Sequence, residues 1–555
     1  MDQLIECVPN FSEGRDPAVL DKITSAIQAV EGVWLLDVDP GAATNRTVVT
    51  FVGAPAAVIE AAVIAGRVSA ELIDMSRHHG EHPRFGAMDV CPLIPIANIT
   101  MDETAEHARE LARRLGEEVG LTVYCYENAA TRPERRNLAV VRKGEYEALE
   151  ARLAKPEHAP DFGPAKFQPR TGATAVGARD FLVAYNVNLN TTSTRRANAI
   201  AFDVREKGRV KREPDPVTGK AVLDADGNEV WIPGALKCCK GIGWFIEEYG
   251  VAQISMNLTN INVTPMHVAF DTCDAKAQER GIRVTGSEAV GMLPLASLLD
   301  AGRYFLAKQQ RSTGVSDREL IHIAVKSMGL DELAPFVPEE KIIEYAIAAR
   351  SRAKRLVDLS LVGFIELTAS ESPAPGGGSV AAALGALGAA LGTMVANLSS
   401  HKRGWDDRWQ EFSEWAEKGK VAQTRLVSLI DEDTQAFNQI MDAWRADADV
   451  REERIQAATR NAIEIPLQVM ETALASLEVS AAMADIGMAA SASDAAVGAL
   501  CARAAVRGAG MNVRINAKDL KDDAARKAYL DRAATLEQDA AEQEAKVLAS
   551  IETKL

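Results

Sequence analysis

A long stretch without any charged side chain is the feature that most constrains how this chain can fold. From Ser372 to Ser400 the sequence contains no Asp, Glu, Lys or Arg, and a helix of this length can cross a membrane. Its apolar content is mainly Ala and Gly, however, with few of the large side chains that favour lipid. We therefore expect a buried helix in a tightly packed helical domain and no membrane span. Three small residues would let a neighbouring helix approach closely: Gly385, Gly388 and Gly392.

The sequence pattern changes at about Asp358. Before this point, short apolar runs alternate with amphipathic helical segments, which is typical of α/β sandwiches. After it, alanine becomes more frequent and helical periodicity dominates. A Pro- and Gly-rich break at residues 156–174 divides the first part, and a basic run that begins at Arg350 marks a linker. The predicted fold is α/β plus all-α, with α/β subdomains at 1–180 and 181–347, a linker at 348–357 and a helical domain at 358–555.

Several elements of the α/β part can be predicted from their ends. Asp16 can cap a helix that starts with Pro17, and Thr100 and Glu103 form a capping box for another helix. We expect strands at residues 33–38, 46–52, 123–126 and 181–189, a helix at 55–75, and a surface excursion with a small hairpin at 209–237.

Composition limits the class of protein. The chain has 555 residues and a net charge of −16, which argues against a general nucleic-acid binder but leaves room for a local basic pocket. The seven cysteines are irregularly spaced, and the adjacent Cys238 and Cys239 are poorly placed to bridge each other. A reduced compartment is therefore expected. The first residues lack the basic region and apolar core of a signal peptide, so we expect a cytoplasmic protein.

Three of the eight histidines fall within five positions, at His78, His79 and His82. Gly80 and Pro83 disfavour a continued helix, so this cluster should lie on a loop. A histidine beside fixed charges can transfer protons near neutral pH, which suggests a proton-transfer site for an anionic substrate. A zinc site is disfavoured, because no further Cys or His completes a ligand set at the usual spacing. A solvated polar turn without chemistry remains an open alternative.

Asp433 stands out in the helical part. Leu426 and Leu429 precede it, and Phe437 and Ile440 follow it, at the spacing that puts all five side chains on one helix face. A carboxylate in an apolar stripe loses hydration, which raises its pKa and suits it to acid–base chemistry. A structural carboxylate, paired with an arginine or capping a neighbouring helix, is the alternative.

Three glycines stand at the start of the uncharged helix. Gly376, Gly377 and Gly378 are followed by Ser379. Backbone amides at a helix start that are not covered by side chains form a ready anion site. Glycine runs are common at helix entries, so this pattern alone does not define a site.

Several longer motifs run through nearly the whole chain. In the α/β part these motifs are residues 6–14 (ECVPNFSEG), 44–47 (TNRT), 80–84 (GEHPR) and 240–244 (KGIGW). In the helical part they are residues 374–379 (APGGGS) and 431–437 (DEDTQAF). Together, and in this order, they resemble the formiminotransferase-cyclodeaminase family, the bifunctional folate enzymes of histidine breakdown.

The resemblance implies a function for each part. The two α/β subdomains, expected to be ferredoxin-like, would transfer a formimino group from formiminoglutamate to the 5-nitrogen of tetrahydrofolate. The helical domain would cyclise 5-formiminotetrahydrofolate to 5,10-methenyltetrahydrofolate and release ammonia. Tetrahydrofolate, possibly polyglutamylated, would be a cosubstrate, with no metal and no tightly bound cofactor. We also expect a homo-oligomer built from dimers.

The resemblance also implies roles for residues. His82 would be the catalytic residue of the transferase and Asp433 that of the cyclodeaminase, and the planar guanidinium of Arg84 suits a substrate carboxylate. A folate-binding segment is implied at Gly163, Pro164, Ala165, Lys166, Phe167, Gln168, Pro169, Arg170, Thr171 and Gly172. Further substrate contacts are expected from Lys237, Lys240, Gly377, Gly378 and Ser379. Cations available for the folate tail are Lys166, Arg170, Arg179, Arg195, Arg196, Lys237 and Lys240.

Two other interpretations remain open from sequence. The α/β part could bind folate without catalysing transfer, while the helical part is an active cyclodeaminase. Alternatively, the helical half could be an oligomerisation scaffold. The excursion at 209–237 is longer than expected for the family, and its role is not predicted.

Overall fold

The computed structural model describes residues 3–42, 44–80, 83–215, 219–350, 355–552 and 554, with only the backbone of Arg350. The predicted catalytic residue His82 and most of the predicted linker therefore lie outside the described residues. The chain forms two compact units, which we describe separately. The first contains Met1–Leu298 and Val325–Ser351, and the second contains Leu299–Ala324 and Arg352–Leu555.

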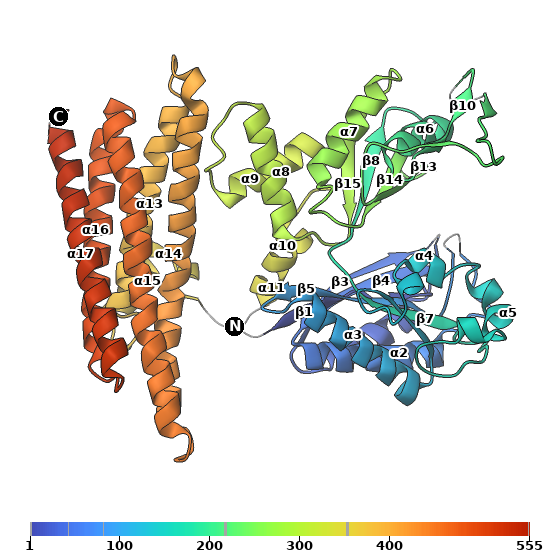
Figure 1. The fold of residues 1–555 in the computed structure, drawn as a ribbon, viewed down its shortest axis with the longest axis horizontal. Coiled ribbons are helices and arrows are strands. Elements are labelled where there is room, and N and C mark those ends of the chain that lie inside the picture. Colours follow the sequence, from blue (N-terminus) through green and yellow to red (C-terminus); the bar gives the residue numbers. More distant parts are fainter. Residues whose placement is uncertain are drawn as a thin grey trace. The chain divides into compact units, whose positions relative to one another are not determined.

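A seven-stranded sheet forms the base of the first unit (Figure 1). Its central position is shared by β1 (Leu4–Cys7) and β2 (Asn10–Phe11), which both pair with β4 and β5. On one side of this central position lie β4 (Arg46–Gly53) and then the edge strand β3 (Val33–Gly41). On the other side lie β5 (Met88–Ala97), β7 (Ala173–Ala178) and then the edge strand β6 (Thr122–Glu127). Strand β7 runs parallel to both of its neighbours, and the other pairs are antiparallel.

One face of this sheet packs against helices. These are α1 (Pro17–Gln28), α2 (Pro55–Leu72) and α3 (Met101–Arg114). Because strand side chains alternate between faces, Ile5, Cys7 and Phe51 point into this helix-covered core, where they are fully buried. Their neighbours in sequence therefore point to the opposite face, which is the face that carries the candidate site.

The predicted helix ends are largely confirmed. Asp16 accepts a hydrogen bond from the amide of Ala18, and Thr100 and Glu103 form both bonds of the capping box. The predicted helix at 55–75 was wrong at its end, because α2 stops at Leu72. Asp74 instead accepts hydrogen bonds from the amide and hydroxyl of Ser76, and this local turn competes with the helix.

A second, antiparallel sheet completes the α/β part. Its order is β13 (Cys239–Ile246), β14 (Val251–Leu258), β8 (Val183–Leu189) and β15 (Val284–Val290). Helices α6 (Thr194–Val204) and α7 (Met266–Gln278) connect its strands. The predicted hairpin in the excursion consists of two small ladders, β9 (Arg209–Val210) with β12 (Trp231–Ile232) and β10 (Arg212–Glu213) with β11 (Lys220–Ala221). The shorter helices are α4 (Leu138–Val141), α5 (Leu149–Leu153), α8 (Leu295–Lys308), α9 (Asp317–Met328), α10 (Pro338–Lys341) and α11 (Ile343–Arg350).

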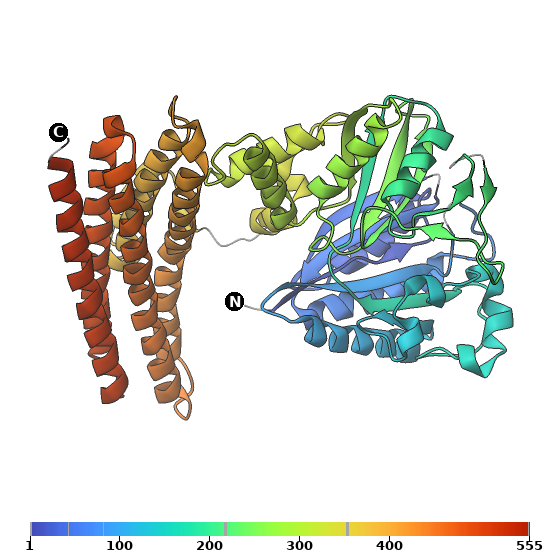
Figure 2. The same ribbon diagram turned by 45° about the horizontal axis from the view of Figure 1, so that its top comes forward.

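The second unit is a bundle of long helices, which lie side by side in both views (Figures 1 and 2). Small and branched apolar residues fill its core. A short helix, α12 (Leu361–Thr368), precedes the bundle. The long helices are α13 (Gly377–Ser400), α14 (Trp409–Trp444), α15 (Arg451–Ile486), α16 (Ala492–Ala517) and α17 (Asp523–Glu552).

One segment of the predicted second α/β subdomain packs on this bundle. The amide of Thr313 donates to the hydroxyl of Ser413 at 3.0 Å, and the side chain of Asn397 donates to the carbonyl of Gly314 at 3.0 Å. A Cβ on Gly314 would lie 2.4 Å from the backbone of Ala416, so only glycine allows this close approach. These contacts explain why residues 299–324 belong to the second compact unit.

Helix α13 is the uncharged stretch. Among the described residues it is the helix that is long and apolar enough to cross a membrane, but 61% of its most apolar window is buried inside the protein. A Cβ on Gly385 would lie 3.1 Å from Leu426, and one on Gly388 would lie 2.7 Å from the carbonyl of Gly498. The predicted buried helix with close neighbours is therefore confirmed.

Candidate active sites

A cavity of about 450 Å³ lies on the face of the first sheet that the helices leave uncovered. Alternate residues of the central strands line it, because they share one face of the pleat. Two features distinguish it from an ordinary apolar cleft: it contains both acidic and basic side chains, and its lining comes from both α/β subdomains. The sheet contributes Glu6, Val8, Asn10, Asp39, Gly41, Arg46, Val48, Thr50, Val90, Pro92 and Tyr126, and the second subdomain contributes Leu182, Ala184, Asn257, Val290, Gly291, Met292 and Ile343.

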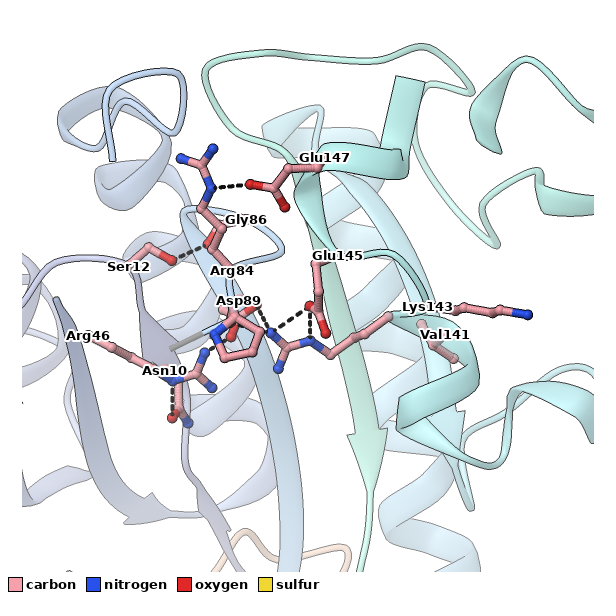
Figure 3. Close-up of polar contacts among 12 residues, drawn as sticks. Asn10, Ser12, Arg46, Arg84, Gly86, Asp89, Val141, Lys143, Glu145 and Glu147 are labelled. Atoms are coloured by element: carbon pink, nitrogen blue, oxygen red, sulfur yellow. Dashed lines mark hydrogen bonds and ion pairs between the residues drawn. The ribbon is translucent and has the colours of Figure 1, made fainter. Parts of the chain in front are cut away.

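A buried cluster of ion pairs adjoins one end of this cavity, where Arg46 and Arg142 line it. Figure 3 shows the contacts within this cluster. Asp89, fully buried, forms an ion pair with Arg46 and lies 3.3 Å from a guanidinium nitrogen of Arg142. Arg46 also donates to the side chain of Asn10 at 3.1 Å, and Arg142 lies 3.0 Å from Glu145. Burial, and then the like charge of Arg142, lower the pKa of Arg46 to about 9. The carboxylates therefore hold two guanidinium groups in place at the cavity wall.

The histidine loop lies beside this end. His78 is buried, and its Nε2 is 2.7 Å from the carbonyl of Asn45, while the side chain of Asn45 donates to the carbonyl of His79. On the other side of the loop, Arg142 donates to the carbonyl of Pro83 at 2.8 Å. The backbone at His79 and at Pro83 is thus held next to residues 44–46 and Arg142, which border the cavity.

The histidines of the cluster have different surroundings. Burial lowers the pKa of His78, which favours its neutral form, and its ring anchors the turn at Asn45. His79 is exposed. Among the described residues, no group of three or more His, Cys, Asp and Glu side chains is arranged to hold a metal ion. His78 therefore anchors the loop, and the catalytic role expected of His82 stays a prediction.

Arg84 is occupied by other groups of the protein. It donates to the carbonyls of Met75 and His78 and to Glu147 at 2.9 Å, and its guanidinium lies 4.5 Å from the centre of the Tyr146 ring. Figure 3 shows its side chain directed to Glu147. Binding of a substrate carboxylate by Arg84 stays a prediction, and the arginines that line the cavity are Arg46, Arg142 and Arg179.

The predicted folate segment lies alongside the histidine loop. The carbonyl of Arg170 accepts from the amide of Met75, and that of Thr171 accepts from the amide of Ala87, both at 2.9 Å. Phe167 packs on Tyr146, whose hydroxyl donates to Pro169. The structure therefore brings together two features that are far apart in sequence. Within the described residues, the cavity lining contains no residue of this segment.

The other predicted cations are dispersed. Arg179 lines the cavity, and Lys240 is paired in the sheet with Asn257, which also lines it. Because cross-strand partners share a face, Lys240 is placed at the cavity rim. Lys237 is exposed and 3.9 Å from Glu206, and Arg195 borders a different hollow near the excursion. Lys166 is exposed as well.

Asp433 defines a second site, in the helical unit. Its Oδ2 accepts hydrogen bonds from the amide of Ser379 at 2.8 Å and from the hydroxyl of Ser379 at 3.0 Å. Burial raises the pKa of Asp433, and the two bonds from Ser379 oppose that shift. Leu426 and Leu429 are fully buried on the same helix face. The direction of this pKa shift agrees with the sequence prediction, whereas Phe437, which was expected on the same apolar face, is exposed.

The glycine run shapes this second site. Helix α13 begins at Gly377, and the carboxylate of Asp433 accepts from an amide of its first turn, which is the anion-binding geometry expected there. A cavity of about 130 Å³ adjoins the pair and is lined by Pro373, Ala374, Gly376, Gly377, Gly378, Asp433, Thr434, Ala436, Phe437, Ile440, Ala462, Asn512 and Asn516. The predicted residues Gly377, Gly378, Ser379 and Asp433 are thus brought together.

Comparison with known proteins covers both sites. Residues 4–179 match the N-terminal subdomain of the formiminotransferase domain, residues 184–348 match the formiminotransferase domain, and residues 360–535 match formiminotransferase-cyclodeaminase. The formimidoyltransferase-cyclodeaminase of Mus musculus is 41% identical over 560 residues, with 100% of both chains covered. The chain belongs to the formiminotransferase-cyclodeaminase family.

Other relatives cover the chain in whole or in part. The formimidoyltransferase-cyclodeaminase of Dictyostelium discoideum is 41% identical, with 94% of each chain covered. The glutamate formimidoyltransferase of Streptococcus pyogenes is 40% identical and covers 55% of this chain and 94% of its own. The α/β half of this chain therefore matches almost the full length of a separate glutamate formimidoyltransferase.

Sequence reasoning missed three residues in or next to the cavity of the α/β unit. Arg142 and Asp89 carry no local signal, because their importance depends on contacts with residues far away in sequence. Glu6 had a signal: it is a charged residue inside the short strand Leu4–Cys7, where an apolar side chain is usual. It is 4% exposed, and burial raises its pKa to about 7, although Arg179 opposes the shift.

Substituting Gly378 with alanine is expected to impair the cyclodeaminase site. A Cβ at this position would lie 2.0 Å from Oδ1 of Asp433 and would displace the carboxylate from Ser379. We expect at least a tenfold loss of ammonia release from 5-formiminotetrahydrofolate. Gly377→Ala is the matched control, because its Cβ would lie 3.5 Å from Asn512, an ordinary contact. Equal activity of both variants would contradict the assigned role of Gly378.

Proposed function

We propose that this chain is a bifunctional folate enzyme. It transfers the formimino group from N-formimino-L-glutamate to tetrahydrofolate and then cyclises 5-formiminotetrahydrofolate to 5,10-methenyltetrahydrofolate with release of ammonia. The full-length similarity to formimidoyltransferase-cyclodeaminases carries this proposal. Support from the structure comes from two separate sites of suitable chemistry, a mixed-charge cavity in the α/β unit and a desolvated carboxylate in the helical unit.

The transferase step requires two proton movements. As the 5-nitrogen of tetrahydrofolate attacks the formimino carbon, unprotonated His82 accepts the proton that this nitrogen loses. The resulting tetrahedral intermediate collapses when the same imidazolium protonates the glutamate nitrogen, which leaves with the electrons of its bond to carbon. Arg142 holds the carbonyl of Pro83, the residue after His82, and so positions this part of the loop. Arg46 and Arg142 supply the positive charge that suits the carboxylates of formiminoglutamate.

The cyclodeaminase step forms one bond and breaks another. The 10-nitrogen attacks the formimino carbon, the 10-nitrogen loses its proton, and the amino group on that carbon gains a proton and leaves as ammonia. Asp433 suits the delivery of that proton, because burial raises its pKa and keeps the protonated form available. Ser379 acts as a positioning residue, since it fixes one carboxylate oxygen by two hydrogen bonds.

Several finer assignments belong to this proposal. Tetrahydrofolate is a cosubstrate, and residues 163–172 form part of its binding region. Both sheets share the strand–helix–strand–strand–helix–strand order, which supports a ferredoxin-like description of the two subdomains. The matched ranges support boundaries near 180 and between 348 and 357. A cytoplasmic location and a homo-oligomer built from dimers stay predictions.

One coupled assay tests the proposed function. Purified protein is mixed with formiminoglutamate and tetrahydrofolate, and methenyltetrahydrofolate is followed by its near-ultraviolet absorbance alongside ammonia release. We expect both products in equal amounts. If neither forms, prepared 5-formiminotetrahydrofolate is added. Turnover of this compound would mean that the chain is a cyclodeaminase with a non-catalytic α/β part. No turnover of this compound would disprove both activities and favour the scaffold interpretation.

A further inference from the structure

Glu6 is a carboxyl group with no partner in the wall of the transferase cavity. Its strand neighbours Ile5 and Cys7 are fully buried in the helix-covered core, so the side chain of Glu6 points to the opposite face, where it lines the cavity. The residue is 4% exposed. Within the described part of the chain, it makes no hydrogen bond or ion pair. A buried carboxylate in this state is costly unless a ligand supplies the missing donors.

The charged groups around Glu6 do not provide that partner. Arg179, which follows β7, and Glu344 of α11 act on it with opposite signs. The Cys7 thiol on its own strand is also close enough to interact electrostatically. Asp39 and Tyr126 line the same cavity. The carboxyl is therefore available to a bound molecule, in a site where both acidic and basic groups are already present.

Glu6 lies at the opposite end of the cavity from the histidine loop. It is four residues from Asn10, whose side chain accepts a hydrogen bond from Arg46 of the ion-pair cluster. Glu6 pairs with Ile94 of β5, and Asn10 pairs with Val90 of the same strand. At about 3.3 Å per strand residue, this separation is roughly 13 Å. A ligand of Glu6 must therefore present hydrogen-bond donors to it, and one that also approaches the ion-pair cluster must be elongated.

We propose that Glu6 binds the pyrimidine edge of the pterin ring of tetrahydrofolate, accepting hydrogen bonds from its 2-amino group and its N3–H. This inference rests on the proposed transferase function and identifies the group that orients the folate. A carboxylate has two oxygens at the spacing of these two donors, so the contact is bidentate. The 5-nitrogen belongs to the other ring of the bicycle, and this orientation directs it toward the end of the cavity that holds Arg142 and the histidine loop.

The amidinium of formiminoglutamate presents the same pair of N–H donors and is the rival ligand. Its two carboxylates suit Arg46 and Arg142, which line the cavity at the Asn10 end. Formiminoglutamate is too short to bind these arginines while its amidinium lies on Glu6, roughly 13 Å away along the strand. The separation therefore favours the pterin.

The test measures binding of two stable ligands to the full-length protein: 5-formyltetrahydrofolate and its analogue with a methyl group in place of the 2-amino group. We expect the natural ligand to bind the original protein at least tenfold more tightly than the analogue. In Glu6→Gln, the Kd of the natural ligand should rise 10- to 100-fold and the preference should disappear. The KM for formiminoglutamate should stay unchanged. Glu127→Gln is the matched control, because Glu127 also lies near Arg179 but outside the cavity lining.

Acidification provides an independent readout. Burial raises the pKa of the free Glu6 carboxyl to about 7, and donors that bind the carboxylate favour its charged form. Binding of 5-formyltetrahydrofolate should therefore weaken as the pH falls below about 7 in the original protein, and the Glu6→Gln variant should lack this dependence. The nearby groups that share the cavity, such as Asp39, remain in the variant and serve as the internal reference.

The possible outcomes separate this inference from the proposed function. Failure of the original protein to bind 5-formyltetrahydrofolate and to turn over its substrates would remove both. Normal binding and turnover in Glu6→Gln would overturn only the role of Glu6. If Glu6→Gln raised the KM for formiminoglutamate but left folate binding unchanged, Glu6 would bind the amidinium instead. If Glu6→Gln weakened the binding of both folate ligands equally, Glu6 would have only a structural role.

Discussion

Asp433→Asn is expected to abolish ring closure while leaving formimino transfer intact. Asparagine keeps the shape of the side chain and can still accept from Ser379, but it cannot donate and recover a proton. Loss of a positioned acid or base lowers a rate by about 100- to 10,000-fold. With formiminoglutamate and tetrahydrofolate as substrates, the variant should accumulate 5-formiminotetrahydrofolate and release almost no ammonia. Product analysis by chromatography measures both.

Asp431→Asn is the control for this substitution. Asp431 lies two residues away on the same helix and accepts a hydrogen bond from the amide of Leu356, so its role is structural. Its variant should keep normal ammonia release. Equal impairment of both variants, together with altered assembly in size-exclusion chromatography, would favour the scaffold interpretation of the helical half.

The pH dependence of ring closure follows from the same contacts. Burial raises the pKa of Asp433, and the hydrogen bonds from Ser379 partly counteract this. If protonated Asp433 delivers the proton to ammonia, the rate falls as the pH rises through this pKa. Ser379→Ala removes an opposing bond, raises the pKa further and should move the decline in rate to higher pH.

Burial of Asp433 also affects folding stability. Because its pKa is raised in the folded protein, the ionised carboxylate destabilises the folded state at alkaline pH. Asp433→Asn should therefore unfold at no lower temperature than the original protein at pH 8.

The parts of the fold that follow local rules could be predicted from sequence. Asp433 was found because helical spacing alone places it among Leu426 and Leu429, and the capping box at Thr100 needs only two residues of one turn. The end of α2 was missed because the Asp74 side chain, rather than the apolar pattern, decides where the helix stops. Local periodicity thus identifies an element more reliably than it locates the element's last residue.

The transferase cavity depends on contacts that no local pattern encodes. Its ion-pair cluster joins Arg46, Asp89 and Arg142, which come from separate elements. Arg142 lines the cavity and Arg84 does not, which only the folded structure shows. Glu6 is marked in the sequence by its charge within a short strand, but only the sheet shows which face of β1 it occupies. A motif can therefore mark the strand that carries a functional residue without showing which of its side chains reaches the substrate.

His82→Gln is expected to produce the reverse separation of activities. Glutamine can replace a hydrogen bond of the imidazole but cannot transfer its proton. Formimino transfer should fall by about 100- to 10,000-fold, and formiminoglutamate should remain unconsumed. Added 5-formiminotetrahydrofolate should still be converted at the original rate, because Asp433 and Ser379 are unchanged.

The two neighbouring histidines provide controls within the same loop. His79 is exposed, so His79→Gln should transfer at the normal rate. His78 is buried against the carbonyl of Asn45, so His78→Gln should lower the temperature of unfolding and reduce transfer only in proportion to the folded fraction. If His79→Gln or His78→Gln eliminated transfer in a fully folded protein while His82→Gln retained it, the catalytic proton carrier would have to be reassigned. The expected order of activities would support the proposed role of His82 in proton transfer.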